Sequence, residues 1–186
     1  MRYILVFALI VFLEFFPESA CAFSFSLEPI VSYERVQKLT PVEHSRDRMA
    51  YGGRLSAGLL FLKTELEYTE GQDSETFSDQ NLSIREKAQR IKAGLRGDIR
   101  IWGFCSVFAR AGVQARQIRR TESVSGADSN DYYEPFQYHP YGGAGLRIGL
   151  GSHVQLTADF TVIFTQYPKF EKNDYQLSSG FSVKLP

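Results

Sequence analysis

The sequence predicts an all-β fold, an eight-stranded antiparallel up-and-down transmembrane β-barrel with short turns at one end and four longer loops at the other. Three observations predict it: apolar residues at alternate positions in eight segments, charges gathered on the opposite face of those segments, and connections of alternating length. Because side chains alternate faces along a strand, each segment has one apolar and one polar side. A membrane barrel turns the apolar side to lipid. A soluble, lipocalin-like barrel with an apolar lumen is the alternative.

Each segment has the two-residue period of a strand. Residues 91–101 show it best, with Ile91 and Ile99 on one face and Lys92 and Arg96 on the other. The first four segments (24–36, 50–59, 61–70, 82–101) have as apolar positions, among others, Phe25, Leu27, Tyr51, Leu55, Leu62, Leu66, Ile91 and Leu95. The last four (106–119, 137–149, 153–166, 175–185) have Val107, Val113, Leu146, Ile148, Leu156, Phe160, Leu177 and Phe181. No helical period competes with this assignment.

The connections between these segments alternate between short and long. The short ones lie near residues 60, 102–105 and 150–152, and the long ones span 37–49, 71–81, 120–136 and 167–174. The long connections are polar and rich in turn-forming residues. Three short turns and four long loops are the arrangement found in outer-membrane barrels, so both chain ends should lie on the short-turn, periplasmic side.

Charged residues on the second face of the strands should fill the lumen. The predicted lumen charge network consists of Arg54, Glu65, Glu67, Arg90, Lys92, Arg96, Arg110, Arg147 and Asp159. A Lys or Arg that faced lipid at the membrane midplane would cost about 2–4 kcal/mol, so this segregation is informative. Eight strands leave an interior just wide enough for side chains to fill. We therefore expect a salt-bridged core, with an ion pathway through a narrow channel as the alternative.

Residues 1–22 have the pattern of a cleaved signal peptide, which leaves 23–186 as the barrel domain. Arg2 provides a positive start, residues 3–13 are uninterruptedly apolar, and Ala20-Cys21-Ala22 is a small-x-small cleavage site. A lipoprotein signal with Cys21 lipidated is the alternative. The 21 basic and 21 acidic residues balance, and no basic block indicates nucleic-acid binding. With Cys21 removed, Cys105 is a lone cysteine, and no disulfide, redox or metal motif is present.

With this architecture and its last strand, residues 177–185, the chain resembles the small eight-stranded outer-membrane barrels of diderm bacteria: the OmpA transmembrane domain, OmpX, OmpW and opacity-type proteins. The final strand looks like the C-terminal signal that such barrels present to the barrel-assembly machinery, although the usual final aromatic residue is absent. The resemblance implies a fold and a location in the outer membrane, among outer-membrane lipids and lipopolysaccharide. It implies little about activity.

We expect a structural or surface-interaction role without enzymatic activity or cofactor, in a monomer. The long loops are candidates for contact with an extracellular ligand, and the exposed-looking aromatics Tyr132, Tyr133 and Phe136 form the most adhesive stretch. The alternative is a lipid A-modifying acyltransferase or deacylase, which needs a histidine, a serine and an acid together at the outer rim. His44 and His139 are the histidines that could take part, with Ser45, Asp47 or Asp131 as candidate partners.

Overall fold

The computed structural model describes residues 23–38, 44–59, 61–77, 82–124, 129–151, 154–166 and 172–185. The predicted signal peptide, residues 1–22, and His153 at the start of the seventh predicted strand lie outside the described residues. Nearly all of the described chain is β-strand. This part contains no helix that is long and apolar enough to cross a membrane.

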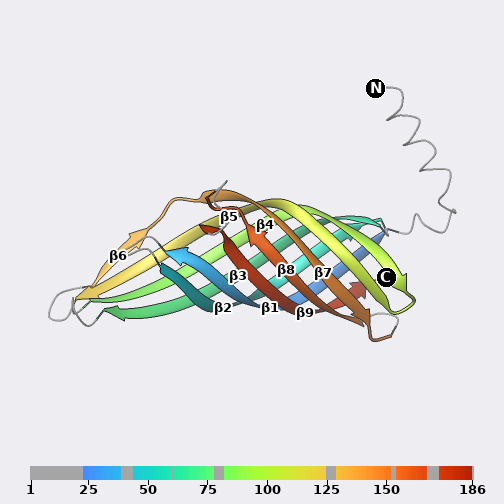
Figure 1. The fold of residues 1–186 in the computed structure, drawn as a ribbon, viewed down its shortest axis with the longest axis horizontal. Helices are drawn as coiled ribbons and strands as arrows, with labels where there is room; N and C mark the ends of the chain where they lie inside the picture. The colour runs from blue at the N-terminus through green and yellow to red at the C-terminus, as the bar shows by residue number, and fades with distance from the viewer. Residues whose placement is uncertain are drawn as a thin grey trace, which may run out of the picture.

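Nine antiparallel strands make up the described chain (Figure 1). They are β1 (Ser24–Lys38), β2 (His44–Gly58), β3 (Leu62–Phe77), β4 (Leu82–Trp102), β5 (Cys105–Val124), β6 (Asn130–Tyr133), β7 (Gln137–Gly149), β8 (Val154–Ile163) and β9 (Asp174–Leu185). Neighbours follow the order β4-β3-β2-β1-β9-β8-β7-β5-β6, and a β4–β5 pairing closes the sheet. Because β6 pairs with the part of β5 beyond β7, the ring itself has eight strands. The predicted eight-stranded barrel is confirmed.

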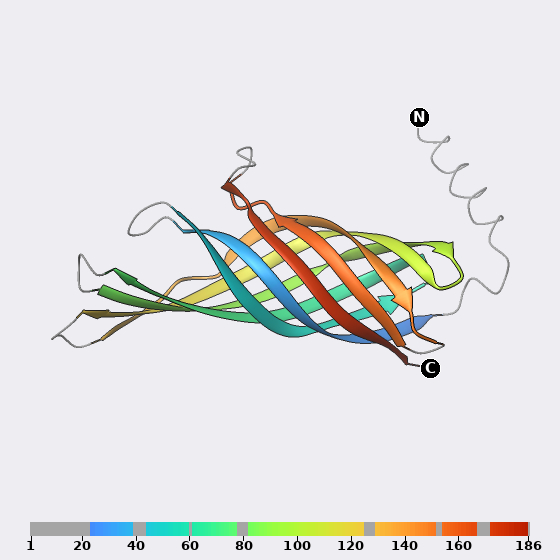
Figure 2. The same ribbon diagram turned by 60° about the horizontal axis from the view of Figure 1, so that its bottom comes forward.

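The short turns and both ends of the described barrel lie together at one end, as predicted (Figure 2). At the start of β1, Ser24 pairs with Gly58, next to the β2–β3 turn. The turns are fixed by backbone hydrogen bonds, one from Asp98 N to Phe61 O at 3.0 Å and one from Gly149 N to Phe104 O at 2.7 Å. We call this the short-turn end, and the opposite end the long-strand end.

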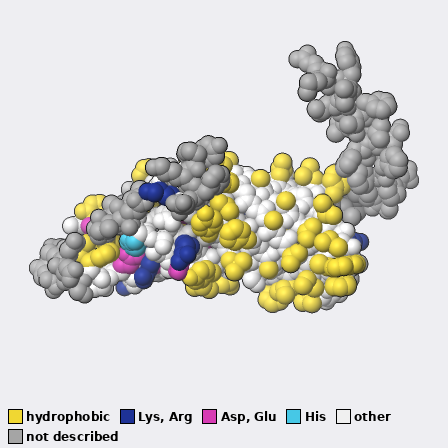
Figure 3. All heavy atoms as spheres, viewed as in Figure 1, with side chains coloured by type: hydrophobic (Ala, Val, Ile, Leu, Met, Phe, Trp, Pro, Cys, Tyr) yellow, Lys and Arg dark blue, Asp and Glu magenta, His cyan; other side chains and the backbone are white. Residues whose placement is uncertain are grey.

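An apolar belt surrounds the wall of the barrel toward the short-turn end, and charged side chains appear toward the long-strand end (Figure 3). The outward residues of the belt are exposed on every strand; they include Leu27, Val31, Leu55, Leu66, Ile91, Leu95, Val113, Leu146, Phe160, Leu177 and Phe181. Exposed aromatics at its two margins include Tyr33, Tyr51, Tyr68, Trp102 and Phe104. An outward apolar band with aromatic margins is the surface of a barrel that lies in lipid.

The predicted long connections are wrong in their extent, because the strands continue well into them. β1 runs to Lys38, β2 begins at His44, β3 runs to Phe77 and β5 to Val124, and β6 lies inside the third predicted connection. We call the parts of β3, β4, β5 and β6 beyond the apolar belt the arm; they comprise residues 70–77, 82–90, 117–124 and 130–133.

The outward face of the arm is polar, whereas the outward face of the belt is apolar. On β4, Ile84 and Ala88 point inward and are buried, while Arg85 and Lys87 are exposed. Farther along the same strand, Ile91 is exposed and Lys92 is buried. The inward apolar residues give the arm a small core of the kind found in water-soluble proteins, so it does not need lipid.

Two facing glycines on β4 and β5 leave space on the inner side of the barrel wall. Gly94 pairs with Gly112, and a Cβ at Gly94 would lie 2.5 Å from the hydroxyl oxygen of Tyr141. The buried Tyr141 ring therefore occupies the space that side chains at these positions would take. There it contacts two bases, with Arg110 Cζ 5.2 Å and Lys92 Nζ 5.9 Å from the ring centroid.

Candidate functional site: the filled lumen and its two openings

Glu67 on β3 lies at the centre of the lumen and is fully buried. Its carboxylate accepts hydrogen bonds from Arg54 Nη2, Lys92 Nζ and Arg110 Nη2, each at 2.8 Å. These bases come from β2, β4 and β5, so one carboxylate joins three strands around the ring. Charge-assisted hydrogen bonds of this length are the strong class.

Further ion pairs cross-brace the lumen around Glu67. Arg54 lies 3.0 Å from Glu28 and 2.9 Å from Asp159, and Arg110 lies 3.3 Å from Glu65. The central network comprises four bases and four acids, Arg54, Lys92, Arg96, Arg110, Glu28, Glu65, Glu67 and Asp159, all buried. Its charges balance, which is the condition under which ions are retained in a water-poor interior.

All nine residues predicted for the lumen network are buried, none more than 5% exposed. Seven of them lie in the central network. The other two pair elsewhere: Arg90 with Glu34 toward the long-strand end, and Arg147 with Asp98, at 3.4 Å, toward the short-turn end. The β3–β4 register places Glu67 opposite Lys92 and Arg90 opposite Thr69.

A second ionic cluster, which we call the clasp, closes the lumen toward the arm. Lys38 Nζ lies 2.9 Å from Asp73, 3.2 Å from Glu75 and 3.0 Å from Glu86. Burial alone would lower the pKa of Lys38, but the hydrogen bond to Asp73 and the negative charge of Glu86 outweigh burial and raise it.

The clasp connects the β1–β2 hairpin to the arm beyond the point where backbone pairing between β2 and β3 ends. Pairing between β2 and β3 ends at Ala50 with Gly71, and beyond it the β1–β2 hairpin diverges from the arm (Figure 2). Side chains bridge the gap, with Lys38 on one side and the acids of β3 and β4 on the other. Sequence reasoning missed this cluster because it assigned Lys38, Asp73 and Glu75 to loops; the continuing alternation on β1 from Glu34 to Lys38 was the available signal.

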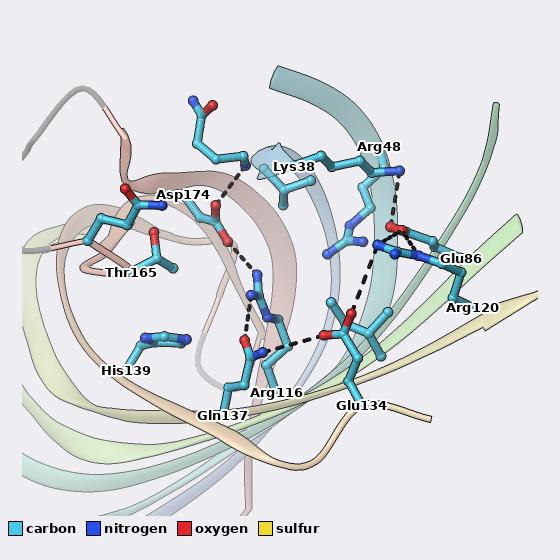
Figure 4. A pocket seen from close by; sticks show the side chains of 14 residues that line it. Lys38, Arg48, Glu86, Arg116, Arg120, Glu134, Gln137, His139, Thr165 and Asp174 are labelled. Atoms are coloured by element: carbon cyan, nitrogen blue, oxygen red, sulfur yellow. Dashed lines mark hydrogen bonds and ion pairs between the residues drawn. The ribbon is translucent and has the colours of Figure 1, made fainter. Parts of the chain in front are cut away.

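A cavity of about 350 Å³ lies at the long-strand mouth of the lumen (Figure 4). Arg48 points into it, held by Glu34 at 3.0 Å. Arg116 donates to Asp174 at 3.0 Å and to Gln137 at 2.8 Å. Each of the four lining bases, Lys38, Arg48, Arg116 and Arg120, thus lies within 3.0 Å of an acid.

A second cavity, of about 460 Å³, opens at the short-turn end, and we call it the vestibule. Lys63, Asp98, Arg100 and Arg147 line it, together with Cys105. Asp98 lies between the vestibule and the central network, 3.2 Å from Arg96 Nε. Arg100, two residues after Asp98 on the same strand, is exposed at this rim.

The predicted surface-contact residues lie at the edge of the arm. Tyr132 and Tyr133 are on β6, and Phe136 follows it; their exposed fractions are 51%, 64% and 50%. Arg119 on β5 lies 5.1 Å from the Tyr133 ring centroid and 2.6 Å from Asp131. Tyr132 and Tyr133 thus lie in a hydrogen-bonded sheet, where the sequence had predicted a loop, whereas Phe136 lies in the connection between β6 and β7.

The two candidate histidines are not neighbours of the acids proposed for them. His44 Nε2 lies 3.2 Å from a carboxylate oxygen of Glu75 on β3. Ser74, the residue before Glu75, is exposed on the opposite face of that strand. Asp47 pairs with Arg35 and Asp131 with Arg119, both on the outer surface. His139 lines the mouth cavity, and no hydrogen bond to its Nε2 is formed among the described residues.

No protein-family model and no curated protein sequence matches the chain. Several solved protein structures, by contrast, match the chain. The chain is similar to Neisserial surface protein A, with a TM-score of 0.65 at 14% identity, over 88% of this chain and 99% of that one. The similarity to Ail of Yersinia pestis, solved with the heparin analogue sucrose octasulfate, has a TM-score of 0.60 at 12% identity, over 88% and 99%. For the N-terminal β-barrel domain of Pseudomonas aeruginosa OprF, the TM-score is 0.56 at 13% identity, over 86% and 97%.

The chain has the fold of the small eight-stranded outer-membrane β-barrels. The similarity covers nearly all of each matched chain. At identities this low the likeness shows the fold, and the activity of this barrel has to be argued from its own residues. Following the prediction from the sequence, the short-turn end is named periplasmic and the arm extracellular below.

Proposed function

We propose that this outer-membrane barrel is a closed scaffold that presents the arm as a contact surface for an extracellular protein. The observation that carries the proposal is the arm itself, a sheet with its own buried core that displays exposed aromatics far from the lipid belt. Solvent-exposed tyrosine and phenylalanine in a rigid setting bury large areas at low entropy cost on binding, and such residues are enriched at interfaces.

The charges of the arm favour a protein over a polyanion as the ligand. Two of its three exposed bases are paired with acids: Arg119 lies 2.6 Å from Asp131, and Lys87 lies 2.7 Å from Glu70. A polyanion-binding face would carry an unmatched cluster of bases. Ail was solved with a heparin analogue, and for this chain we propose that heparin binds weakly if at all.

The contact surface can be tested with refolded protein in lipid nanodiscs. Fibronectin and collagen serve as immobilised protein probes and heparin as the polyanion. Replacing Tyr132, Tyr133 and Phe136 together by serine should weaken binding to a protein probe at least about tenfold. Phe104→Ser is the matched control, since Phe104 is 64% exposed at the opposite end. Binding to heparin alone, lost at high salt, would argue against the proposal.

Closure of the lumen can be tested in planar lipid bilayers. With the central network packed across the barrel, the refolded protein should show no steady conductance, because eight strands leave room only for side chains. Arg54→Ala removes a fully buried guanidinium that contacts Glu28, Glu67 and Asp159, so it should create brief openings. Large, salt-dependent conductance of the unmodified protein would instead support the narrow-channel alternative.

The lipid A-modifying enzyme remains the rival proposal. Its test is mass spectrometry of lipid A from cells with and without the protein. Unchanged acyl chains are the expected result. A change in acylation that His44→Ala or His139→Ala abolishes would favour the enzyme. We also propose export through cleavage of residues 1–22, insertion by the barrel-assembly machinery of a diderm bacterium, and a monomer among outer-membrane lipids and lipopolysaccharide.

A further inference from the structure

The periplasmic vestibule differs from the rest of the lumen in its charge balance. In the central network four bases face four acids. In the vestibule Lys63, Arg100 and Arg147 are lining bases, and among the described lining residues Asp98 is the one acid. Asp98 is shared further, since Arg96 also lies 3.2 Å from it. The cavity therefore has a positive potential, and its low-dielectric walls concentrate it.

Arg147 is a buried base in the lining of the vestibule. The residue is 5% exposed, and its Nη1 lies 3.4 Å from Asp98. Its other two nitrogens, Nε and Nη2, are buried and have no hydrogen-bond partner among the described residues. The ring of Phe108 lies between two guanidinium groups, with its centroid 4.0 Å from Arg96 Cζ and 5.7 Å from Arg147 Cζ. Buried guanidinium donors are normally satisfied. Arg110 also has two donors without a hydrogen bond, but three carboxylates lie within 3.5 Å of its guanidinium, whereas among the described residues Arg147 has Asp98 alone. Arg147 is therefore the buried base with room for a further acceptor.

We propose that the vestibule is a binding site for an oxyanion group, a phosphate or a carboxylate, that enters from the periplasm. Arg147 donates to the oxyanion from its buried fork, a geometry that matches two oxygens of one group. Arg100 at the rim adds attraction during entry. The volume of about 460 Å³ accommodates such a group together with part of the molecule that carries it. This site lies at the opposite end from the arm and is independent of the proposed function.

Cys105 offers a built-in reporter, because it lines the same cavity and is half-buried. The chain has two cysteines, so Cys21→Ser leaves Cys105 alone. In detergent-refolded protein, the rate of Cys105 modification is measured with a sulfonate-bearing and with a trimethylammonium-bearing methanethiosulfonate. The positive potential should favour the anionic reagent about tenfold over its cationic counterpart, relative to their rates with a free thiol.

Occupancy by an oxyanion is tested by protection at constant ionic strength. Inorganic phosphate and acetate are the two probes, and chloride is the control. Phosphate or acetate should slow the anionic reagent, and the more effective of the two identifies the preferred group. Protection by neither, beyond that of chloride, would overturn the proposal.

Substitutions assign the effect to the named residues. Arg147→Gln should abolish both the reagent preference and the protection, while Arg85→Gln, which removes an exposed base on the outer face of the arm, should change neither. If Arg147→Gln fails to fold, Arg100→Gln at the exposed rim should still lower the preference severalfold. A preference that survives both Arg147→Gln and Arg100→Gln would refute the site.

Discussion

Replacing Glu67 by glutamine keeps the shape of the side chain and removes the charge that Arg54, Lys92 and Arg110 share. The substitution leaves the three bases with different numbers of carboxylate partners. Arg54 keeps Glu28 at 3.0 Å, and Arg110 keeps Glu65 at 3.3 Å. Lys92 loses its carboxylate partner and keeps the amide oxygen of Gln176. The cost of the substitution is therefore mainly that of leaving one buried ammonium poorly paired.

The magnitude follows from that geometry. A pair of unit charges 4 Å apart is worth about 4 kcal/mol at an effective dielectric of about 20, and desolvation offsets part of it. Removing one partner of a buried pair costs about 3–5 kcal/mol, and we expect this loss in the free energy of unfolding for Glu67→Gln. Adding Lys92→Met removes the orphaned charge, so the double variant should recover about half of the loss or more.

The assay is urea-induced unfolding in lipid vesicles, followed by the fluorescence of Trp102. It is the one tryptophan of the chain and lies 63% exposed at the periplasmic margin of the belt. Asp131→Asn is the control, because its ion pair with Arg119 is exposed and should leave the midpoint unchanged. A loss below about 1 kcal/mol for Glu67→Gln, or no recovery in the double variant, would show that water fills the lumen.

Two further outcomes follow from the fold. Gly112→Val should abolish the folded, heat-modifiable band on gels, since a Cβ there would lie 2.6 Å from Gly94 Cα; Gly103→Val, with nothing within 4 Å, should fold. The clasp should depend on pH: burial would raise the pKa of Glu75, but hydrogen bonds from His44 and Lys38 hold it below its ordinary 4.5. Stability from a depressed pKa is present above 4.5 and lost below it as pH falls. The distance between spin labels at Ser45 and Ser74 should therefore be constant from pH 7 to 5 and increase only in stronger acid.

The barrel could be predicted because the membrane imposes its pattern on every strand. Because one face of each strand contacts lipid, Ile91 and Ile99 share a face opposite Lys92. The lengths of the connections then predict which end of the barrel carries both chain ends. The arm could not be predicted because its inward apolar residues are few and alternate with charged residues. Ile84 and Ala88 alternate with Glu86 and Arg90 on the inward face of β4, so the sequence of this segment is mostly polar and does not indicate which face is inward.

Pairings within the lumen could not be predicted for a different reason. Which charges meet depends on the register of neighbouring strands, and a shift of register exchanges every partner. Arg90 and Lys92 lie on the same face of β4, yet only the observed register places Lys92 beside Glu67 and leaves Arg90 for Glu34. Lys38 was missed because its three acids come from β3 and β4, which are far from it in sequence.

The reversal of pattern on β4 also sets how thick a bilayer this protein can match. Between Ile91 and Ile101 the outward face is apolar or small, and just above it stand Lys87 and Arg85. Ten residue steps of about 3.4 Å, inclined by about 45°, give a hydrophobic height of about 24 Å. That suits the bacterial outer membrane, which is thinner than most. In a thicker bilayer the charged outer face of the arm cannot be drawn inward, so the lipid must thin around the barrel, and lipid chain length should govern how readily the protein inserts.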